Sequence, residues 1–214
     1  MTTIVGYIDH EGRTWVGADR LVTTGGYSFR VPGGVCKLLR AGPWVVGLAG
    51  STMLHVRLKA RLEVLAEQDD AGWVGEELLA LVRAQGWEAE KGPGDPPRYS
   101  MAGVIGRDGE LWELEPTGLV SVVEGVFVSV GSGWKYAYGA WCAARDIIVS
   151  DGRRMVEGCL SAAAAFDCGT GGGTDVWEAG PWARPVVDEA RSEASADPGM
   201  ALRRFLSGGG GVKP

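Results

Sequence analysis

The sequence lacks the residues on which several common kinds of active site depend. Only two of its 214 residues are histidines, and its four cysteines form no Cys-x-x-Cys pair. Protein zinc sites need such ligands at close spacing, so no metal or other cofactor is predicted. A Ser-His-Asp triad is hard to build, because His10 falls in a polar turn and His55 on a predicted helix. The cysteines are expected to be scattered, reduced thiols: Cys36, Cys142, Cys159 and Cys168.

Excess positive charge and long apolar runs are also missing. The chain has 21 Lys and Arg against 27 Asp and Glu, a net charge of −6, so nucleic acid is not expected as a partner. Its apolar runs are far shorter than the ~20 residues of a membrane-spanning helix. The segment after Met1 has no basic region of the kind that begins a signal peptide. These absences predict a cytoplasmic protein with no membrane partner.

Glycine, in contrast, is abundant. The 35 glycines are about 16% of the chain, roughly twice the usual ~7%, and they follow no collagen-like repeat. Glycine at this level is expected in turns and where the backbone approaches another group closely. The run Gly169–Gly173 is only weakly similar to a phosphate-binding loop, because it has no lysine and precedes a predicted strand.

The predicted elements alternate between blocks of strands and pairs of helices. Strands are predicted at 3–8, 14–18, 43–48, 101–105, 110–115, 119–123, 126–130 and 175–178, and helices at 54–65, 74–85, 136–149 and 153–166. The Asp9-His10-Glu11-Gly12 turn and the Asp108-Gly109 pair predict hairpins, and residues 88–97 are predicted to form a loop. The first helix is predicted from leucines at helical spacing, Leu54, Leu58, Leu62 and Leu65. The order of the elements favours two stacked sheets with a helical layer outside each. Residues 1–180 are predicted to form one domain. The Pro-, Ala- and Gly-rich segment 181–214 is expected to be a partly mobile extension.

Thr2 offers a nucleophile that needs neither histidine nor metal. A small residue after Met1 permits removal of that methionine, which would leave Thr2 with a hydroxyl and a free α-amine. The intrinsic pKa of such an amine is ~7.7–8, so it can accept the hydroxyl proton near neutral pH. Threonine at position 2 is common, however, and alone it predicts almost nothing.

Further segments match one family when they are taken together. They are Thr2-Thr3-Ile4-Val5-Gly6, Gly17-Ala18-Asp19-Arg20, Thr23-x-Gly25, Cys36-Lys37, Gly47-Leu48-Ala49-Gly50-Ser51, Val130-Gly131-Ser132-Gly133 and 167–171. In this order they resemble the proteasome β-subunit family, and within it the bacterial HslV-type peptidases. The resemblance implies an α+β fold, the four-layer αββα sandwich of N-terminal-nucleophile (Ntn) hydrolases, with two antiparallel sheets flanked by helices. It also implies a threonine endopeptidase.

The resemblance implies a catalytic role for each matching residue. Thr2 would be the nucleophile, with its own amine as general base. Lys37 would lower the pKa of that amine and favour the developing alkoxide, while Asp19 holds the lysine. The backbone N–H of Gly50 would point into the oxyanion hole. The remaining catalytic positions are Ser132 near the amine, Asp167, which orients it, and Thr170, where the family usually has serine.

By the same correspondence, a mostly apolar pocket would bind the residue before the cleaved bond. Its lining would be Val22, Val35, Leu48 and Thr52, while Thr23 and the Gly50 backbone hold the peptide as an added strand. Cleavage after apolar residues is therefore expected. The family further implies a polypeptide substrate, a homo-oligomeric ring and, for some members, an ATP-dependent unfoldase.

Besides Thr170, the chain departs from the family in further respects. Arg20 directly follows Asp19, although the family often has its arginine two positions later, where Leu21 stands here. No propeptide other than Met1 is expected, and segment 181–214 has no counterpart.

Other interpretations remain open. Taken singly, Lys37 fits a surface lysine, Asp19 a turn residue, Gly50 a strand end and Ser132 a helix start. Two alternatives concern the whole chain: an Ntn amidohydrolase acting on a small amide, and a catalytically silent ring subunit that retains Met1.

Overall fold

The computed structural model describes residues 2–24, 27–29, 35–61, 67, 69–84, 90, 96–147 and 151–180. The predicted extension 181–214 and most of the predicted loop 88–97 lie outside this part of the chain. Within the described ranges, no helix has the length and apolar character needed to cross a membrane.

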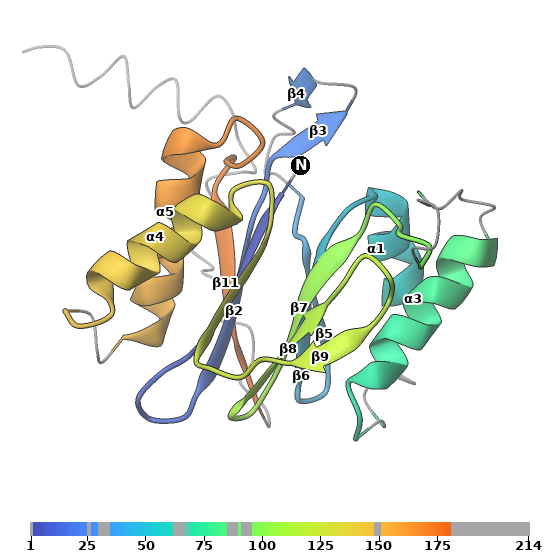
Figure 1. The fold of residues 1–214 in the computed structure, drawn as a ribbon, viewed down its shortest axis with the longest axis horizontal. Coiled ribbons are helices and arrows are strands. Elements are labelled where there is room, and N and C mark those ends of the chain that lie inside the picture. Colours follow the sequence, from blue (N-terminus) through green and yellow to red (C-terminus); the bar gives the residue numbers. More distant parts are fainter. Residues whose placement is uncertain are drawn as a thin grey trace, which may run out of the picture. The chain divides into compact units, whose positions relative to one another are not determined.

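Four antiparallel strands form the first sheet, in the order β10-β1-β2-β11. They are β10 (Phe127–Gly131), β1 (Thr3–Ile8), β2 (Thr14–Asp19) and β11 (Thr174–Ala179). The predicted hairpin of the first two strands is confirmed, with Ile4 opposite Ala18 and Ile8 opposite Thr14. The last strand of the domain therefore lies beside β2, although about 150 residues separate the two in sequence (Figure 1).

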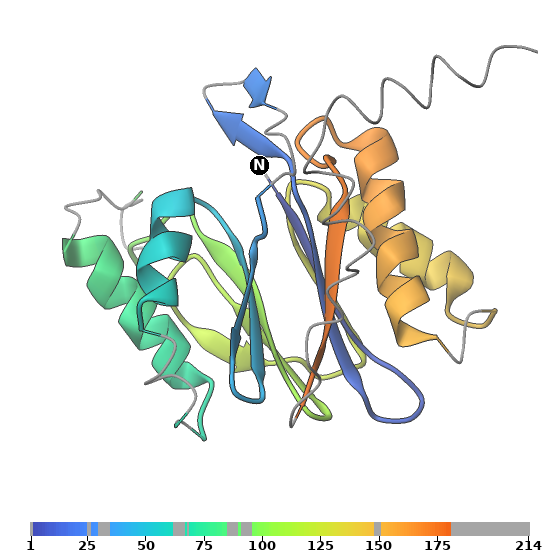
Figure 2. The same cartoon turned by 180° about the vertical axis from the view of Figure 1, so that it is seen from behind.

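Five antiparallel strands form the second sheet in sequence order. They are β5 (Leu38–Ala41), β6 (Trp44–Ala49), β7 (Ala102–Arg107), β8 (Glu110–Leu114) and β9 (Val120–Val122). The Asp108-Gly109 turn joins β7 to β8 as predicted, and Gly109 has a φ of 74°, a conformation that favours glycine. Seen from behind, the strands β5 and β6 of this sheet lie beside β11 of the first sheet (Figure 2).

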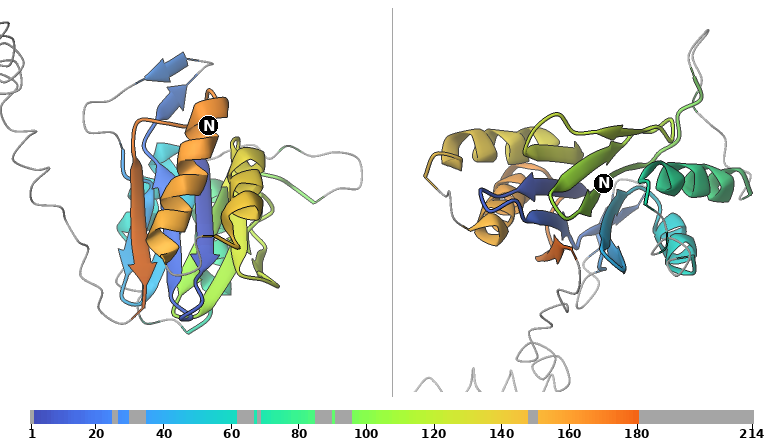
Figure 3. Two further views of the ribbon diagram at one scale, coloured as in Figure 1. Left: turned by 90° about the vertical axis from the view of Figure 1, so that its left-hand side faces the viewer. Right: turned by 90° about the horizontal axis from the view of Figure 1, so that it is seen from below.

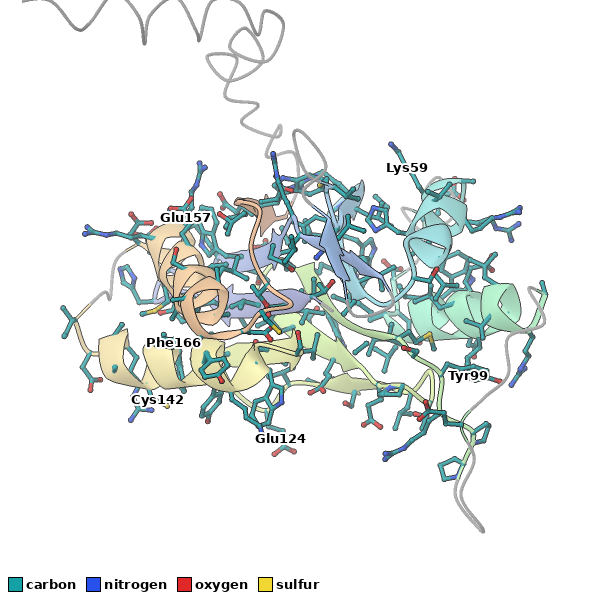
Figure 4. The ribbon with its side chains drawn as sticks, turned by 90° about the horizontal axis from the view of Figure 1, so that it is seen from above. Lys59, Tyr99, Glu124, Cys142, Glu157 and Phe166 are labelled. Carbon is teal, nitrogen blue, oxygen red and sulfur yellow. The ribbon has the colours of Figure 1, made fainter. Side chains whose placement is uncertain are left out.

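Helices cover the outer face of each sheet. Contacts join α5 (Gly152–Phe166) to β1 and β2, and α4 (Trp134–Ala144) to β10, whereas α1 (Thr52–Lys59) and α3 (Gly72–Ala84) pack at the second sheet. Figure 3 shows these layers from the side and from below. In Figure 4, Lys59 on α1 and Glu157 on α5 lie on opposite sides of the paired sheets. The order helix, sheet, sheet, helix is the predicted αββα sandwich.

The hydrophobic core has one cluster for each interface between layers. Ile4, Val16, Val45 and Val104 are buried between the sheets. One outer cluster joins the second sheet to α1 and α3, and the other joins β1 to α5. Gly47 permits the close approach of the sheets, because a Cβ there would lie 2.6 Å from Cγ2 of Ile4. Part of the glycine excess thus serves the packing of the layers.

Three strands were missed and some predicted ends are wrong. The pair β3 (Val22–Thr24) and β4 (Tyr27–Phe29), and β5, were not predicted, since each has only three or four residues and β5 consists of Leu, Arg and Ala, which do not favour strands. The helix predicted from residue 54 to 65 begins at Thr52 and ends at Lys59. The helix α4 begins at Trp134 and ends at Ala144, before β-branched residues that are poor helix formers.

Candidate active site

Thr2 lies directly before β1, at one end of the paired sheets, where the amino terminus is marked in Figure 1. Thr2 is buried, and its carbonyl oxygen accepts a hydrogen bond of 2.9 Å from the backbone N–H of Ser132. Gly131 lies against Thr2 and has a φ of 93°. A Cβ on this glycine would lie 1.8 Å from the backbone carbonyl oxygen of Thr2. The ends of β1 and β10 together therefore fix the position of Thr2.

Asp19, at the end of β2, is fully buried and accepts four hydrogen bonds. Its Oδ1 accepts from the Thr3 backbone at 2.9 Å and from Nζ of Lys37 at 2.8 Å. Its Oδ2 accepts from the backbone N–H groups of Leu21 at 3.0 Å and Gly171 at 3.1 Å. The predicted pairing of Asp19 with Lys37 is therefore present, and the same Asp19 oxygen binds the backbone of Thr3, the residue that follows Thr2.

Lys37 is a buried cation, only 7% exposed. Burial lowers the pKa of its ammonium group, although the Asp19 carboxylate acts in the opposite direction. The ammonium is thus held by one strong charge-assisted contact in a poorly solvated place. A cation so placed would act on nearby charge more strongly than a lysine in water.

Ser132, Asp167 and Thr170 form a second network. The hydroxyls of Ser132 and Thr170 each donate to Oδ2 of Asp167 over 2.6 Å. Burial tends to raise the pKa of the Asp167 carboxyl, but the hydrogen bonds from Ser132, Thr170 and the Gly169 backbone act against it, and the net effect is a lowered pKa. Asp167 directly follows α5, and the loop after it returns Thr170 to the same carboxylate. Thr170, for which the resemblance leads one to expect serine, thus supplies a hydroxyl to Asp167.

Arg20 ties the glycine-rich loop to the end of β2. Its side chain forms an ion pair with Asp175 of β11, in which Nε donates to Oδ2 over 2.9 Å. Its backbone N–H lies 3.0 Å from the carbonyl oxygens of both Gly171 and Gly173. Three successive glycines in this loop have positive φ angles. The loop therefore braces Asp19, and its contacts differ from those of a phosphate cradle.

The residues predicted to bind substrate are described only in part. Val22 and Val35 are half-buried and Leu48 is buried. Val35 lies against the loop after β2, since its N–H donates to the carbonyl of Arg20 at 3.3 Å. The side chains of Thr23 and Thr52 lie outside the described part of the chain.

Gly50, the predicted oxyanion donor, follows β6. It has a φ of 136°, and a Cβ there would lie 2.7 Å from the Ser100 carbonyl oxygen. This conformation explains why a glycine occupies the position. Its predicted role toward substrate stays a prediction.

Two of the four cysteine thiols are poorly suited to act as nucleophiles. Burial raises the pKa of the Cys36 thiol to about 11 and that of Cys159 to about 12, so both stay protonated at neutral pH. Among the described residues, no three His, Cys, Asp or Glu side chains gather as metal ligands would.

Two features of the site were not predicted from the sequence. The Thr3 side chain and the backbone of Gly133 take part in the second network through hydrogen bonds described below. The sequence feature that could have pointed to Thr3 is its position directly after Thr2. No spacing rule, however, predicts its contacts with Thr170 and Gly133.

Comparison with solved structures identifies the fold. The chain is similar to Thiobacillus denitrificans BPH, with a TM-score of 0.68 and 21% identity over 82% of this chain and 96% of that one. The same protein in complex with Epoxomicin gives 0.67 and 21% over 82% and 97%. Eukaryotic HslV from Trypanosoma brucei gives 0.59 and 24% over 82% and 98%. The chain has the HslV fold.

The αββα architecture implied by the resemblance to the proteasome β-subunit and HslV-type proteins is thereby confirmed over most of the chain. No protein-family model and no curated protein matches the chain. Within this HslV fold, the two carboxylate networks meet at the first residues of β1.

Proposed function

We propose that the chain is a threonine endopeptidase whose nucleophile is the hydroxyl of Thr2, exposed at the amino terminus by removal of Met1. One observation carries this proposal. On an HslV fold, the Asp19–Lys37 pair and the Ser132–Asp167–Thr170 network both contact the first residues of β1. A purely structural strand end does not need a buried lysine and two buried or half-buried carboxylates.

In the proposed reaction, the α-amine of Thr2 accepts the proton of its own hydroxyl. The oxygen then attacks the carbonyl carbon of the peptide, and the N–H of Gly50 stabilises the resulting oxyanion. The C–N bond breaks as the proton passes to the leaving amine, which gives an ester on Thr2. Water hydrolyses this ester, with the amine again serving as base, and the free threonine is restored.

The charges near the amine suit this cycle. A cationic Lys37 disfavours a second positive charge, so it lowers the pKa of the amine and keeps a larger fraction neutral. Ser132 and Asp167 would hold the amine in place through the serine oxygen. The proton of Ser132 is already donated to Asp167, so this oxygen is available as an acceptor.

The substrate is proposed to be a polypeptide with an apolar residue before the cleaved bond. Val22, Val35 and Leu48 support this preference, since a charged side chain would lose its hydration among them. Faster cleavage after acidic or basic residues in a peptide library would contradict it. Assembly into a ring, an ATP-dependent unfoldase partner and a cytoplasmic location stay predictions that rest on the resemblance, and native mass spectrometry tests the ring.

The intact mass of the purified chain and its hydrolysis of peptides test the proposal. We expect loss of one methionine, followed by a mass gain with a peptide electrophile directed at threonine. Thr2→Ala should abolish hydrolysis and labelling, whereas Thr2→Ser should keep both.

Retention of Met1 together with no hydrolysis would favour the silent ring subunit. Hydrolysis of small amides but not of peptides, lost in Thr2→Ala, would favour the Ntn amidohydrolase.

A further inference from the structure

Thr3 has an unusual place between the two networks. Its backbone N–H donates to Oδ1 of Asp19 at 2.9 Å, the same oxygen that binds Lys37. Its side-chain oxygen lies 2.6 Å from Oγ1 of Thr170, which in turn is bonded to Asp167. Thr3 thus contacts one carboxylate network through its backbone and the other through its side chain, and it is fully buried.

The direction of the hydrogen bonds in this chain follows from the number of protons. The single hydroxyl proton of Thr170 is donated to Asp167. Thr3 must therefore donate its own proton to the oxygen of Thr170. The oxygen of Thr3 accepts the backbone N–H of Gly133 at 3.1 Å. The series of hydrogen bonds therefore runs from Gly133 through Thr3 and Thr170 to the Asp167 carboxylate, and each donor is used once.

The packing leaves little freedom around the Thr3 hydroxyl. A Cβ on Gly133 would lie 2.4 Å from the Thr3 oxygen and 2.9 Å from that of Thr170. Gly133 comes directly before α4 and directly after Ser132, the other donor to Asp167. A shift of the Thr3 hydroxyl would therefore move both hydroxyls that surround the Asp167 carboxylate.

We propose that Thr3 is a positioning residue that holds the Asp19–Lys37 pair and the Ser132–Asp167–Thr170 network in fixed register around Thr2. This inference rests on the proposed function, because the groups being positioned are the nucleophilic hydroxyl and the α-amine of Thr2. Thr3 itself does not touch the reacting atoms. Its hydroxyl orients Thr170, and its backbone keeps β1 at the distance from Asp19 that Lys37 requires.

Three variants of the full chain test this role. Thr3→Val keeps the shape and removes the hydrogen bonds, whereas Thr3→Ser keeps the hydroxyl. Thr14→Val is the matched control, since Thr14 is also fully buried on this sheet, but its hydroxyl has no hydrogen-bond partner in the described part of the chain. We expect Thr3→Val to lower kcat about ten- to a hundredfold with KM within about twofold, while Thr3→Ser and Thr14→Val stay within about threefold.

A second readout does not depend on activity. Hydrogen exchange at the Gly133 amide should become at least about tenfold faster in Thr3→Val and stay unchanged in Thr3→Ser. Unchanged exchange in Thr3→Val overturns the inference, whether or not the wild-type chain hydrolyses peptides. A wild-type chain that hydrolyses no peptide overturns the proposed function instead, so the two failures can be distinguished.

A double-mutant cycle with Thr170→Val decides whether Thr3 acts through Thr170. If it does, Thr3→Val adds less than about twofold to the loss of kcat in the Thr170→Val background. Fully multiplicative losses, or equal losses in Thr3→Val and Thr3→Ser, overturn the inference. Circular dichroism and the Tm of each variant verify that the fold is retained.

Discussion

Two buried aspartates stand at opposite ends of the β1–β2 hairpin, and each accepts four hydrogen bonds. Asp9, in the turn, accepts from the backbone of Glu11 and Arg13 and from the side chains of Arg13 and Trp15. Among the described residues, all donors to this carboxylate lie within six residues of it. Asp19 instead accepts from Leu21 nearby and from three more distant residues, Thr3, Lys37 and Gly171, up to 152 residues away. The first carboxylate closes a local turn, and the second joins distant segments.

The two cations also differ. The Arg13 side chain is 37% exposed beside Asp9, whereas that of Lys37 is only 9% exposed beside Asp19. The hydrogen bond that Arg13 donates to Asp9 raises the pKa of Arg13, while burial lowers the pKa of Lys37 despite the neighbouring Asp19 carboxylate. Although the two aspartates accept the same number of these hydrogen bonds, their cations differ. Arg13 holds its proton more strongly beside Asp9, and Lys37 holds its proton less strongly beside Asp19. Burial of the cation distinguishes the end of the hairpin where the active site is proposed from the end that closes the turn.

Removal of the cation at each end should separate the two roles most strongly. We expect Lys37→Met to lower kcat about 10²–10⁴-fold, because the amine of Thr2 loses the charge that keeps it neutral. The same variant should lose up to about 3–5 kcal/mol of stability, since Asp19 stays buried without its partner. Arg13→Met is the matched control and should leave kcat unchanged. Equal kcat values for the two variants would contradict the assignment of Lys37.

A methyl group added at each end should give the next largest difference. Gly133→Ala places a Cβ 2.4 Å from the Thr3 oxygen, so kcat should fall about ten- to a hundredfold. Gly152→Ala places a Cβ 2.3 Å from Nε1 of Trp15 and 3.0 Å from Oδ2 of Asp9. This crowding should cost about 1–3 kcal/mol of stability and leave kcat intact. Steady-state kinetics and urea unfolding distinguish the two, and a loss of kcat in Gly152→Ala would remove the distinction.

The smallest effect on activity is expected for Asp9→Asn. Burial tends to raise the pKa of Asp9, but hydrogen bonds from Trp15 and Arg13 outweigh it and lower the pKa below the ordinary 3.8. Its ionised form therefore stabilises the fold above about pH 4, and this contribution is lost as the pH falls through the lowered value. Asp9→Asn should cost about 1–3 kcal/mol at pH 7 and nothing at strongly acid pH, with kcat unchanged. Unfolding curves from pH 2 to 7 measure this, and a cost that does not vary with pH would contradict it.

Much of the fold could be predicted because its long elements have regular patterns. The short β-rich run of β1 predicted a strand, the leucine spacing in α1 predicted a helix, and the Asp108-Gly109 pair predicted a hairpin. The short strands β3, β4 and β5 could not be predicted, because three or four residues carry too little pattern. Their pairing is decided by neighbours distant in sequence.

The residues of the candidate site could be predicted only where they match motifs of the family that the sequence resembles. Asp19, Lys37, Ser132, Asp167 and Thr170 were named from their order, and the structure brings them into two networks. The ion pair of Arg20 with Asp175 and the hydrogen bonds of Thr3 depend on where β11 and the glycine-rich loop come to lie. No local property of Arg20 or Thr3 contains that information, so only the folded chain shows it.

The hydrogen bond between Thr3 and Thr170 spans 167 residues, which has a consequence for biosynthesis. Thr3 is synthesised 167 residues before Thr170, its hydrogen-bond partner. At about 5–20 residues per second, Thr3 waits roughly 10–35 s for this partner. Until Thr170 has been made, the Ser132–Asp167–Thr170 network at the start of β1 is incomplete. If Thr2 is the nucleophile, as proposed, the unfinished chain therefore has no complete active site.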